Sequence, residues 1–283
     1  MKSGALIALI ILFALSTSSS MTIQGKRVLV TGGGRGIGRA IARICCNEGA
    51  NVAVVSRSQS DLDEVVALAS SSDRMMALVC DVTDPRQVHS MVLKIAEKWG
   101  GIDILINNAG RAQPEKNPVD LLENSEDLVQ VLQVNVVAVH IVTSTVLRLA
   151  MPKNGHILNI SSKAGKVGIA NMSFYVASKF ALEGLTAAWA KELEDRGIVV
   201  NSISPGMVDT QSFPKPSGRP GVRTAESIRD SLLMAITAPI KYSGHYIHAD
   251  ELDMVRKCEL PDWVAWKKID ENPMEEFLPP ADF

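Results

Sequence analysis

Net charge is almost absent from this chain. Its 283 residues include 29 lysines and arginines against 31 aspartates and glutamates, for a formal net charge of −2. Proteins that bind nucleic acid need clustered positive charge to neutralise the phosphate backbone. We therefore expect no nucleic-acid partner. Hydrophobic residues make up 46% of the chain and charged residues 21%, which favours a packed core over disorder.

Cysteines and clustered metal ligands are also few. The four cysteines are Cys45, Cys46, Cys80 and Cys258. Their spacings match neither a zinc-binding pair nor a disulfide framework, so we interpret them as small apolar core residues. His245 and His248 fall in a predicted strand, where residues three apart point to opposite faces. The sequence therefore predicts no metal site.

The apolar run at residues 5–15 is too short to predict a membrane span, which needs about 20 residues, although it resembles the core of a signal peptide. Two interpretations stay open for residues 1–21. In the first, this segment attaches a cytosol-facing protein to a membrane. In the second, it is an extension upstream of a folded part that starts near Met21. Unpaired cysteines argue against export. The glycosylation sequons at Asn159 and Asn171 do so too, because they lie close to the site predicted below and a glycan at either would obstruct its chemistry. We expect a cytoplasmic or membrane-associated location, with the secretory pathway as the alternative.

From residue 26 onward, short β-branched runs alternate with longer amphipathic stretches. Seven runs are typical of buried strands: residues 26–32, 51–57, 75–81, 102–110, 155–161, 198–206 and 244–249. Asp84 followed by Pro85 predicts a helix that runs to about Lys98, because an N-cap acid precedes proline at the first helical position. The alternation predicts an α/β, Rossmann-type doubly wound fold, with a seven-stranded, mostly parallel sheet and helices on both faces. Ligands bind such sheets at the carboxyl ends of the strands.

A glycine-rich turn, TGGGRGIG at residues 31–38, joins the first predicted strand to a helix. Gly32, Gly36 and Gly38 allow the backbone to turn tightly and approach a phosphate, and the helix start presents free N–H groups. The spacing matches neither G-x-G-x-x-G nor the G-K-[ST] of nucleoside triphosphate loops. By itself, this turn indicates only a phosphate-binding loop.

The end of the second predicted strand favours NADP(H) over NAD(H). An acid at this point holds the ribose hydroxyls of NAD, whereas arginine accommodates the 2′-phosphate of NADP. Here the strand ends in Ser56 and Arg57, and Arg35 in the glycine turn offers a second guanidinium. The alternative is that both arginines are merely solvated.

Tyr175 and Lys179 lie four residues apart in a predicted helix and therefore share one face. Nearby positive charge favours a phenolate, so the pair suits acid/base chemistry. The alternative is an ordinary helical pair. Ser162 ends the fifth predicted strand, where its hydroxyl can hydrogen-bond a substrate oxygen, and the adjacent Ser161 is a competing candidate.

Taken together, TGGGRGIG, NNAG (107–110), Asn135 in QVNVVA, NISS, YVASK and SPGMVDT (204–210) resemble the short-chain dehydrogenase/reductase family over residues 24–248. The resemblance implies an oxidoreductase that transfers hydride between NADP(H) and a carbonyl or alcohol. It selects Ser162, thirteen residues before the tyrosine, as the catalytic serine. It implies that Tyr175 is the acid/base, that Lys179 binds the ribose and lowers the tyrosine pKa, and that Asn135 holds a water.

The resemblance also implies a set of cofactor-binding residues. Asp81 and Val82 would meet the adenine. NNAG would support the central strand beside the adenosine ribose, with Asn107, Ala109 and Gly110 facing the cofactor. The nicotinamide would lie against the segment after the sixth strand. The implied cofactor-binding positions are Gly32, Gly34, Arg35, Gly36, Ile37, Gly38, Ser56, Arg57, Asp81, Val82, Asn107, Ala109, Gly110, Tyr175, Lys179, Pro205, Gly206, Val208 and Thr210.

We divide the chain into the N-terminal segment 1–21, a Rossmann-fold dehydrogenase/reductase domain at 22–249, and a C-terminal extension at 250–283, in which Trp263 and Trp266 are candidates for packing. The partner is a small carbonyl or alcohol substrate. The alternatives are a 3-oxoacyl thioester reductase and a catalytically silent NADP-binding regulator. The resemblance implies a homodimer or homotetramer. Lys215, Arg219 and Arg223, in a loop beside the site, are candidates for attracting an acidic substrate, and the favoured alternative is that they belong to a solvated, mobile loop.

Overall fold

A computed structural model describes residues 22–114, 117–121, 125–210, 214–215, 219–257 and 266–268. The expectations for residues 1–21, Cys258 and Trp263 lie outside these residues. The strands are β1 (Arg27–Thr31), β2 (Asn51–Ser56), β3 (Met75–Val79), β4 (Ile104–Asn107), β5 (His156–Ile160), β6 (Val199–Ser204), β7 (His245–His248) and β8 (Trp266–Lys268). They form one sheet in the order β3-β2-β1-β4-β5-β6-β7-β8.

The first seven strands are parallel, as the sequence predicts. β8 was not predicted, and it pairs antiparallel with β7 at the edge of the sheet. The segment that we assign to a C-terminal extension, residues 250–283, therefore contributes a strand to the sheet of the domain.

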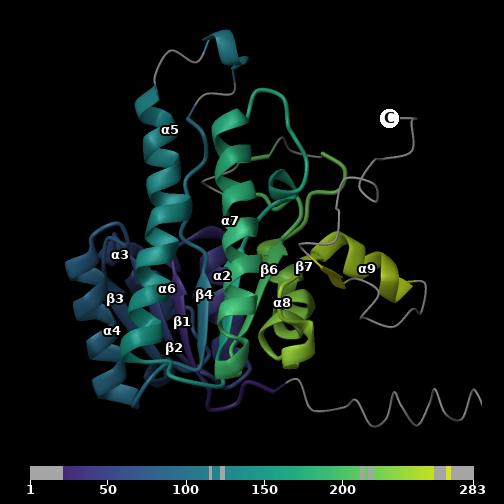
Figure 1. Ribbon diagram of the computed structural model, residues 1–283. Helices are drawn as coiled ribbons and strands as arrows, with labels where there is room; N and C mark the ends of the chain where they lie inside the picture. The colour runs from purple at the N-terminus through teal and green to yellow at the C-terminus, as the bar shows by residue number, and fades with distance from the viewer. Residues whose placement is uncertain are drawn as a thin grey trace, which may run out of the picture.

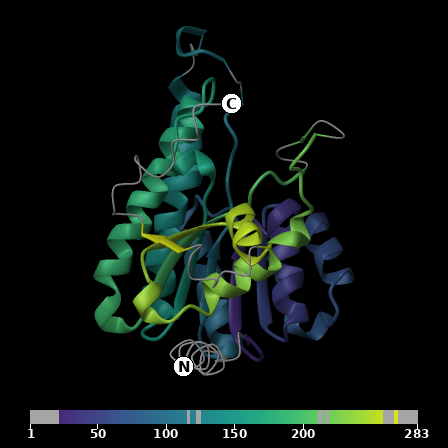
Figure 2. The same cartoon turned by 90° about the vertical axis from the view of Figure 1, so that its right-hand side faces the viewer.

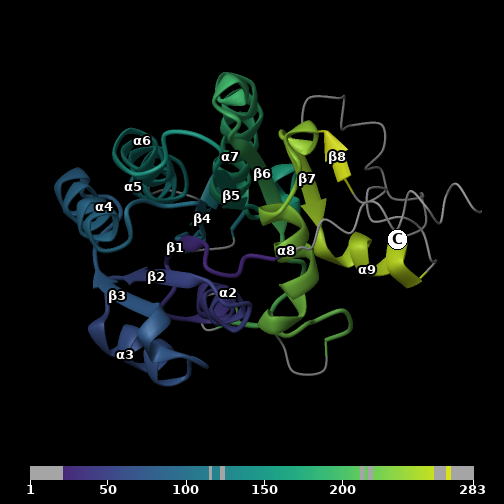
Figure 3. The same ribbon diagram turned by 90° about the horizontal axis from the view of Figure 1, so that it is seen from below.

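Helices cover both faces of this sheet (Figure 1, Figure 3). The helices are α2 (Gly36–Asn47), α3 (Gln59–Ala67), α4 (Pro85–Trp99), α5 (Ser125–Leu132), α6 (Ala138–Leu149), α7 (Ser173–Glu192), α8 (Arg229–Ile236) and α9 (Ala249–Lys257). The group α4 to α7 lies on one face, and α2, α3 and α8 lie on the other (Figure 3). α4 begins as predicted, because the Asp84 carboxylate accepts from the N–H groups of Arg86 and Gln87.

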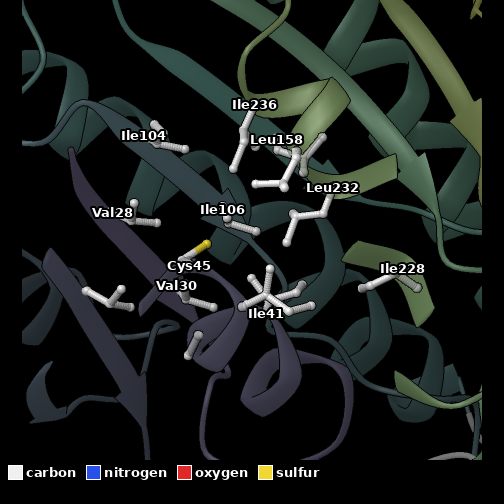
Figure 4. Packing of buried hydrophobic residues seen from close by; sticks show 14 of the residues in the cluster. Val28, Val30, Ile41, Cys45, Ile104, Ile106, Leu158, Ile228, Leu232 and Ile236 are labelled. Atoms are coloured by element: carbon white, nitrogen blue, oxygen red, sulfur yellow. The ribbon is translucent and has the colours of Figure 1, made fainter. Parts of the chain in front are cut away.

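Two apolar cores lie on the two faces, because successive strand residues point in opposite directions. Val28 and Val30 of β1 pack with α2 and α8, whereas Leu29 between them belongs to the core under α4, α6 and α7. Figure 4 shows the first of these cores, in which Cys45 packs among aliphatic side chains. The three described cysteines are buried and free, which confirms their interpretation as core residues.

A single helical stretch, Ser125–Leu149, contains α5, α6 and the π-helical turn η3 (Gln133–Val137) between them. It is long and apolar enough to cross a membrane by length and composition, and 44% of its most apolar window is buried inside the fold. It packs against α4 and α7 (Figure 1). We therefore regard it as a core helix of the domain. The π turn within it contains Asn135, one of the predicted site residues.

Candidate active site

The glycine turn forms a cradle that excludes side chains. Gly32 and Gly36 have φ values of 63° and 54°, in the left-handed region that favours glycine. A Cβ on Gly38 would lie 2.2 Å from the Gly32 carbonyl oxygen, and one on Gly36 would lie 3.3 Å from Thr210. α2 begins here without a side-chain cap. A close-packed backbone beside uncapped helix N–H groups fits the pyrophosphate of a dinucleotide.

The NNAG segment supports this cradle from the neighbouring strand. The Asn108 amide donates to the carbonyl oxygens of Thr31 and Gly32, at 3.0 Å each. In return, the Thr31 hydroxyl accepts from the N–H groups of Asn108 and Ala109. Sequence reasoning missed the role of Asn108. Its signal was a polar residue directly after a buried strand, adjacent in the sheet to the glycine turn.

Asn107 requires a correction. We expected it to face the cofactor, but its side chain is buried and its amide donates to Thr143 (3.0 Å) and Asn159 (2.9 Å). The Asn159 amide in turn donates to Thr186 at 2.8 Å. The Asn107 side chain therefore joins β4 to β5, α6 and α7. Asn159 has no exposed surface, so its sequon is closed to modification in the folded protein.

Two exposed guanidinium groups flank the contact between the glycine turn and β2. Gly34 packs against Ser56 so closely that a Cβ on Gly34 would lie 2.8 Å from the Ser56 hydroxyl. Arg35 and Arg57 are the next residues after Gly34 and Ser56, so this contact brings their backbones close together. Both arginines are exposed, and neither forms an ion pair within the part of the chain that the structure describes. Arg39, by contrast, is bound to Glu64 and the Gly34 carbonyl. Arg35 and Arg57 are therefore available to a phosphate.

The end of β3 lies farther along the same edge of the sheet. Asp81 accepts from the N–H and hydroxyl groups of Thr83, and Val82 is buried. The Asp81 backbone N–H is bonded to Gln87 of α4. This turn is thus held rigidly at the position expected to meet the adenine.

Tyr175 and Ser162 meet at the carboxyl end of the central strands. Burial raises the pKa of the Tyr175 phenol to about 12, and its hydrogen bond with Ser162 opposes this rise. Ser162 also accepts from the Ala164 N–H at 3.2 Å. The Ser161 hydroxyl is buried and has no hydrogen-bond partner among the described residues. Of the two candidate serines, the geometry places Ser162 against the tyrosine.

Lys179 lies on the same face of α7 as Tyr175, with its Nζ 5.6 Å from the centroid of the tyrosine ring. The Nζ donates to the Ile160 carbonyl at 2.9 Å. Burial lowers the pKa of Lys179 to about 8, and Glu183 opposes this. We expected Lys179 to lower the pKa of Tyr175. Among the protein's own groups, burial dominates that pKa instead, and Ser162 is the group that counters it.

Asn135 occupies the π turn η3 and links the loop after NNAG to α7. Its Oδ1 accepts from the Arg111 N–H at 2.8 Å, and its amide donates to the Arg111 carbonyl and to the Ser178 hydroxyl. Ser178 then donates to the carbonyl of Tyr175 at 2.7 Å. Single-turn π bulges in helices are frequent at functional sites. Here the bulge allows one amide to hold two segments together.

Gln113 is a second link that sequence reasoning missed. α7 has no side-chain cap of its own at Met172. The Gln113 Oε1 accepts instead from the N–H groups of Phe174 (3.0 Å) and Tyr175 (3.4 Å). A side chain about sixty residues away in sequence therefore caps the helix that carries the tyrosine. No local pattern marks such a cap.

The segment after β6 closes the site on the other side. Thr210 lies against Gly36 of the cradle, and Val208 is buried and forms an isolated bridge with Arg223. Gly206, after Pro205, has a φ of 79°. Arg223 forms ion pairs with Asp250 (2.7 Å) and Asp253 (2.9 Å). Its guanidinium is therefore committed to α9, contrary to the idea that it attracts an acidic substrate.

No group of three or more potential metal-ligating side chains occurs within the described residues. A protein-family model described as short chain dehydrogenase matches residues 26–217. The chain belongs to the short-chain dehydrogenase/reductase family. It is 36% identical over 192 residues to the 3-oxoacyl-[acyl-carrier-protein] reductase FabG of Thermotoga maritima, covering 67% of this chain and 77% of that protein.

Other relatives have different names. The 3beta-hydroxysteroid dehydrogenase of Mediterraneibacter gnavus is 36% identical over 202 residues, covering 71% of this chain and 72% of that protein. A short chain dehydrogenase structure from Shigella flexneri, solved with NADP, has a TM-score of 0.74 at 26% identity and covers 82% of this chain and all of that one. The family membership shows that this protein is an oxidoreductase acting on CH–OH or C=O groups.

Proposed function

We propose that the protein is an NADP(H)-dependent reductase that converts a carbonyl group to an alcohol, or catalyses the reverse, through Tyr175, Ser162, Lys179 and Asn135. The observation that carries the proposal is the buried Tyr175 phenol, hydrogen-bonded to Ser162 and lying beside Lys179. The glycine cradle lies at the same carboxyl end of the parallel strands. This common position supports a single site that holds both a proton donor and a dinucleotide.

The bound nicotinamide would supply or accept the hydride. In reduction, the Tyr175 hydroxyl donates its proton to the carbonyl oxygen, and the Ser162 hydroxyl hydrogen-bonds that oxygen as negative charge develops on it. A phenol whose pKa lies near 12 is fully protonated at neutral pH, which suits an acid. In the oxidation of an alcohol, Tyr175 must first lose this proton. Lys179 would hold the ribose hydroxyls of the bound cofactor. Asn135 keeps α7 fixed to the neighbouring loop.

The preference for NADP(H) rests on Arg35 and Arg57. Both guanidinium groups are exposed and without ion pairs in the described chain, beside the Ser56 contact, where an additional phosphate on the adenosine ribose would lie. Guanidinium groups fork onto phosphate oxygens. An actinorhodin polyketide ketoreductase structure with NADPH, at 26% identity and a TM-score of 0.67, supports the same choice. NAD(H) is the less favoured cofactor.

A 3-oxoacyl thioester is the second candidate substrate class, and similarity to FabG favours it. The identity to the Thermotoga maritima enzyme is 36%, over two thirds of this chain. The third reading, a silent cofactor-binding regulator, is disfavoured because the tyrosine, serine, lysine and asparagine are all present and buried or hydrogen-bonded in one site.

The test is a spectrophotometric assay of NADPH oxidation by the full chain with ketones, aldehydes, quinones and an acetoacetyl thioester, each repeated with NADH. Turnover of a simple carbonyl with NADPH supports the leading proposal. Turnover of the thioester alone selects the second candidate. Binding of NADPH, detected by its fluorescence, without turnover of any compound would favour the regulator.

A further inference from the structure

The guanidinium group of Arg223 is largely buried, and no step of the chemistry described above uses it. Its side chain is 11% exposed. It forms ion pairs with two carboxylates of α9, Asp250 (2.7 Å) and Asp253 (2.9 Å), and it donates to the hydroxyl (2.7 Å) and carbonyl (3.0 Å) of Ser227. Each of its three nitrogen atoms therefore donates to at least one of these groups. Such a planar, fully bonded fork holds a side chain in one position.

The backbone of Arg223 is joined to the segment that follows β6. Its N–H donates to the Met207 carbonyl at 2.9 Å, and the residue forms its isolated bridge with the buried Val208. One residue thus binds α9 through its side chain and the segment after β6 through its backbone. Figure 2 shows α9, in yellow, beside the loop that leads to α8. Arg223 couples the position of this segment to the position of α9.

Asp250 also contacts the segment directly. A Cβ on Gly206 would lie 2.5 Å from the Asp250 Oδ1, which is the oxygen that Arg223 binds. The Asp250 backbone is itself fixed to the end of β7, because its N–H donates to the His248 Nδ1 at 3.3 Å. Residues 206–208 are therefore in contact with both Arg223 and the start of α9.

The other end of this segment reaches the glycine cradle. Thr210 is the residue that a Cβ on Gly36 would meet at 3.3 Å, and Gly36 is the first residue of α2. A stretch of five residues, 206–210, therefore runs from α9 to the turn proposed to hold the pyrophosphate. A shift at its α9 end would displace the backbone that is proposed to lie against the nicotinamide.

The geometry points to Arg223 as a positioning residue: by binding Asp250 and Asp253, it fixes residues 206–208 in the place where they pack against the nicotinamide half of the cofactor. The start of α9, which we assign from the sequence to a C-terminal extension, then supports the cofactor site. The inference rests on the proposed use of NADP(H) and gives α9 a role toward one half of that cofactor only.

The test compares NADPH with 2′,5′-ADP, which carries the adenosine and the 2′-phosphate and lacks the nicotinamide, by isothermal titration calorimetry of the full chain. In Arg223→Met, the dissociation constant of NADPH rises by about tenfold, because residues 206–208 must then be ordered when the nicotinamide binds. The dissociation constant of 2′,5′-ADP changes by less than about twofold, because Arg35 and Arg57 are unaffected. General damage to the fold would weaken both ligands alike.

Two further variants test whether Arg223 and its carboxylates act as one unit. Arg223→Lys keeps the charge and loses the fork of donors, so it weakens NADPH by about threefold. Asp250→Asn combined with Asp253→Asn removes both partners and weakens NADPH by about tenfold, as Arg223→Met does. Adding Arg223→Met to this double variant causes no further loss, because interacting groups are not additive.

Arg229→Met is the matched control. Arg229 also pairs with two carboxylates, Glu48 (2.6 Å) and Asp230 (2.9 Å), and Glu48 lies at the opposite end of α2 from the glycine turn. This variant leaves both dissociation constants unchanged. Unaltered affinity for NADPH in Arg223→Met, or an equal loss of both ligands, would overturn the inference. If the unaltered protein binds neither ligand, the proposed cofactor is wrong, and the role of Arg223 falls with it.

Discussion

The cofactor half and the catalytic half of this site are built in opposite ways. The cofactor half, around the glycine turn and the end of β2, presents backbone and two exposed arginines without ion pairs in the described chain. The catalytic half, on α7 and the ends of β4 to β6, is buried and joined by side-chain hydrogen bonds through Asn135, Gln113 and Glu183. Substitutions in the first half should change affinity alone, whereas many in the second half should change stability as well.

This difference follows from what each half must do. A phosphate is bound by backbone N–H groups and by guanidinium groups. These groups can remain exposed to water before the cofactor binds at little cost in free energy. An acid that donates a proton to one oxygen needs a fixed direction, which packing and hydrogen bonds supply. The contrast predicts which variants separate binding from catalysis.

Apart from substitution of Tyr175 itself, the largest effect is expected from Ser162→Ala. Removal of one hydrogen-bond donor to a developing oxyanion lowers kcat by about 10²–10³-fold. Ser161→Ala is the matched control, because the Ser161 hydroxyl is buried without a partner in the described structure. Steady-state kinetics of both variants check this. Equal losses in the two variants would show that the geometry does not distinguish the serines.

Arg57→Ala tests the exposed half. Loss of a charged hydrogen bond to the 2′-phosphate raises the KM for NADPH by roughly 10–100-fold, while the KM for NADH and the melting temperature stay unchanged. Arg148→Ala, an exposed arginine of α6, is the control for general loss of positive charge. If NADPH and NADH are affected equally, Arg57 does not read the phosphate.

The pH dependence should differ between the two reaction directions. The raised pKa of Tyr175, about 12, keeps the phenol protonated through the neutral range. Carbonyl reduction is then insensitive to pH between about 6 and 8, whereas alcohol oxidation rises by up to about tenfold per pH unit, because it needs the phenolate. Initial rates in both directions across this range provide the check. An oxidation rate that falls as the pH rises would contradict the assignment.

The smallest effect concerns the cap that Gln113 supplies. Gln113→Ala removes the acceptor for the first N–H groups of α7 and lowers the free energy of unfolding by about 1 kcal/mol. Gln59→Ala on the exposed surface of α3 changes it by less than about 0.5 kcal/mol. Urea denaturation measures both. A Gln113 variant as stable as the Gln59 variant would show that α7 needs no cap from the loop.

Local patterns predicted most of the fold and the positions of the site. Continuous apolar runs predicted seven parallel strands, and Asp84 with Pro85 predicted the start of α4, because these signals reside in neighbouring residues. The glycine turn could be predicted for the same reason. β8 escaped prediction, since three residues at Trp266–Lys268 form a strand only because β7 offers them an edge.

The contacts that sequence reasoning missed join residues that lie far apart in the sequence. Gln113 caps a helix about sixty residues later, and Asn107 turns toward Thr143 and Asn159, not toward the cofactor. Glu183 reads as an ordinary charged residue on a helix, but the packed sheet places Lys166 and Ser202 against it. The high pKa of Tyr175 reflects burial, which only the assembled structure reveals.

The most direct measurement compares Tyr175→Phe with the unaltered protein, using the best carbonyl substrate and an independent fluorescence titration of NADPH. With Tyr175 as the acid, the variant binds NADPH with the same dissociation constant and loses about 10²–10⁴-fold in kcat. A variant that binds NADPH normally and reduces the substrate at the full rate would contradict the account.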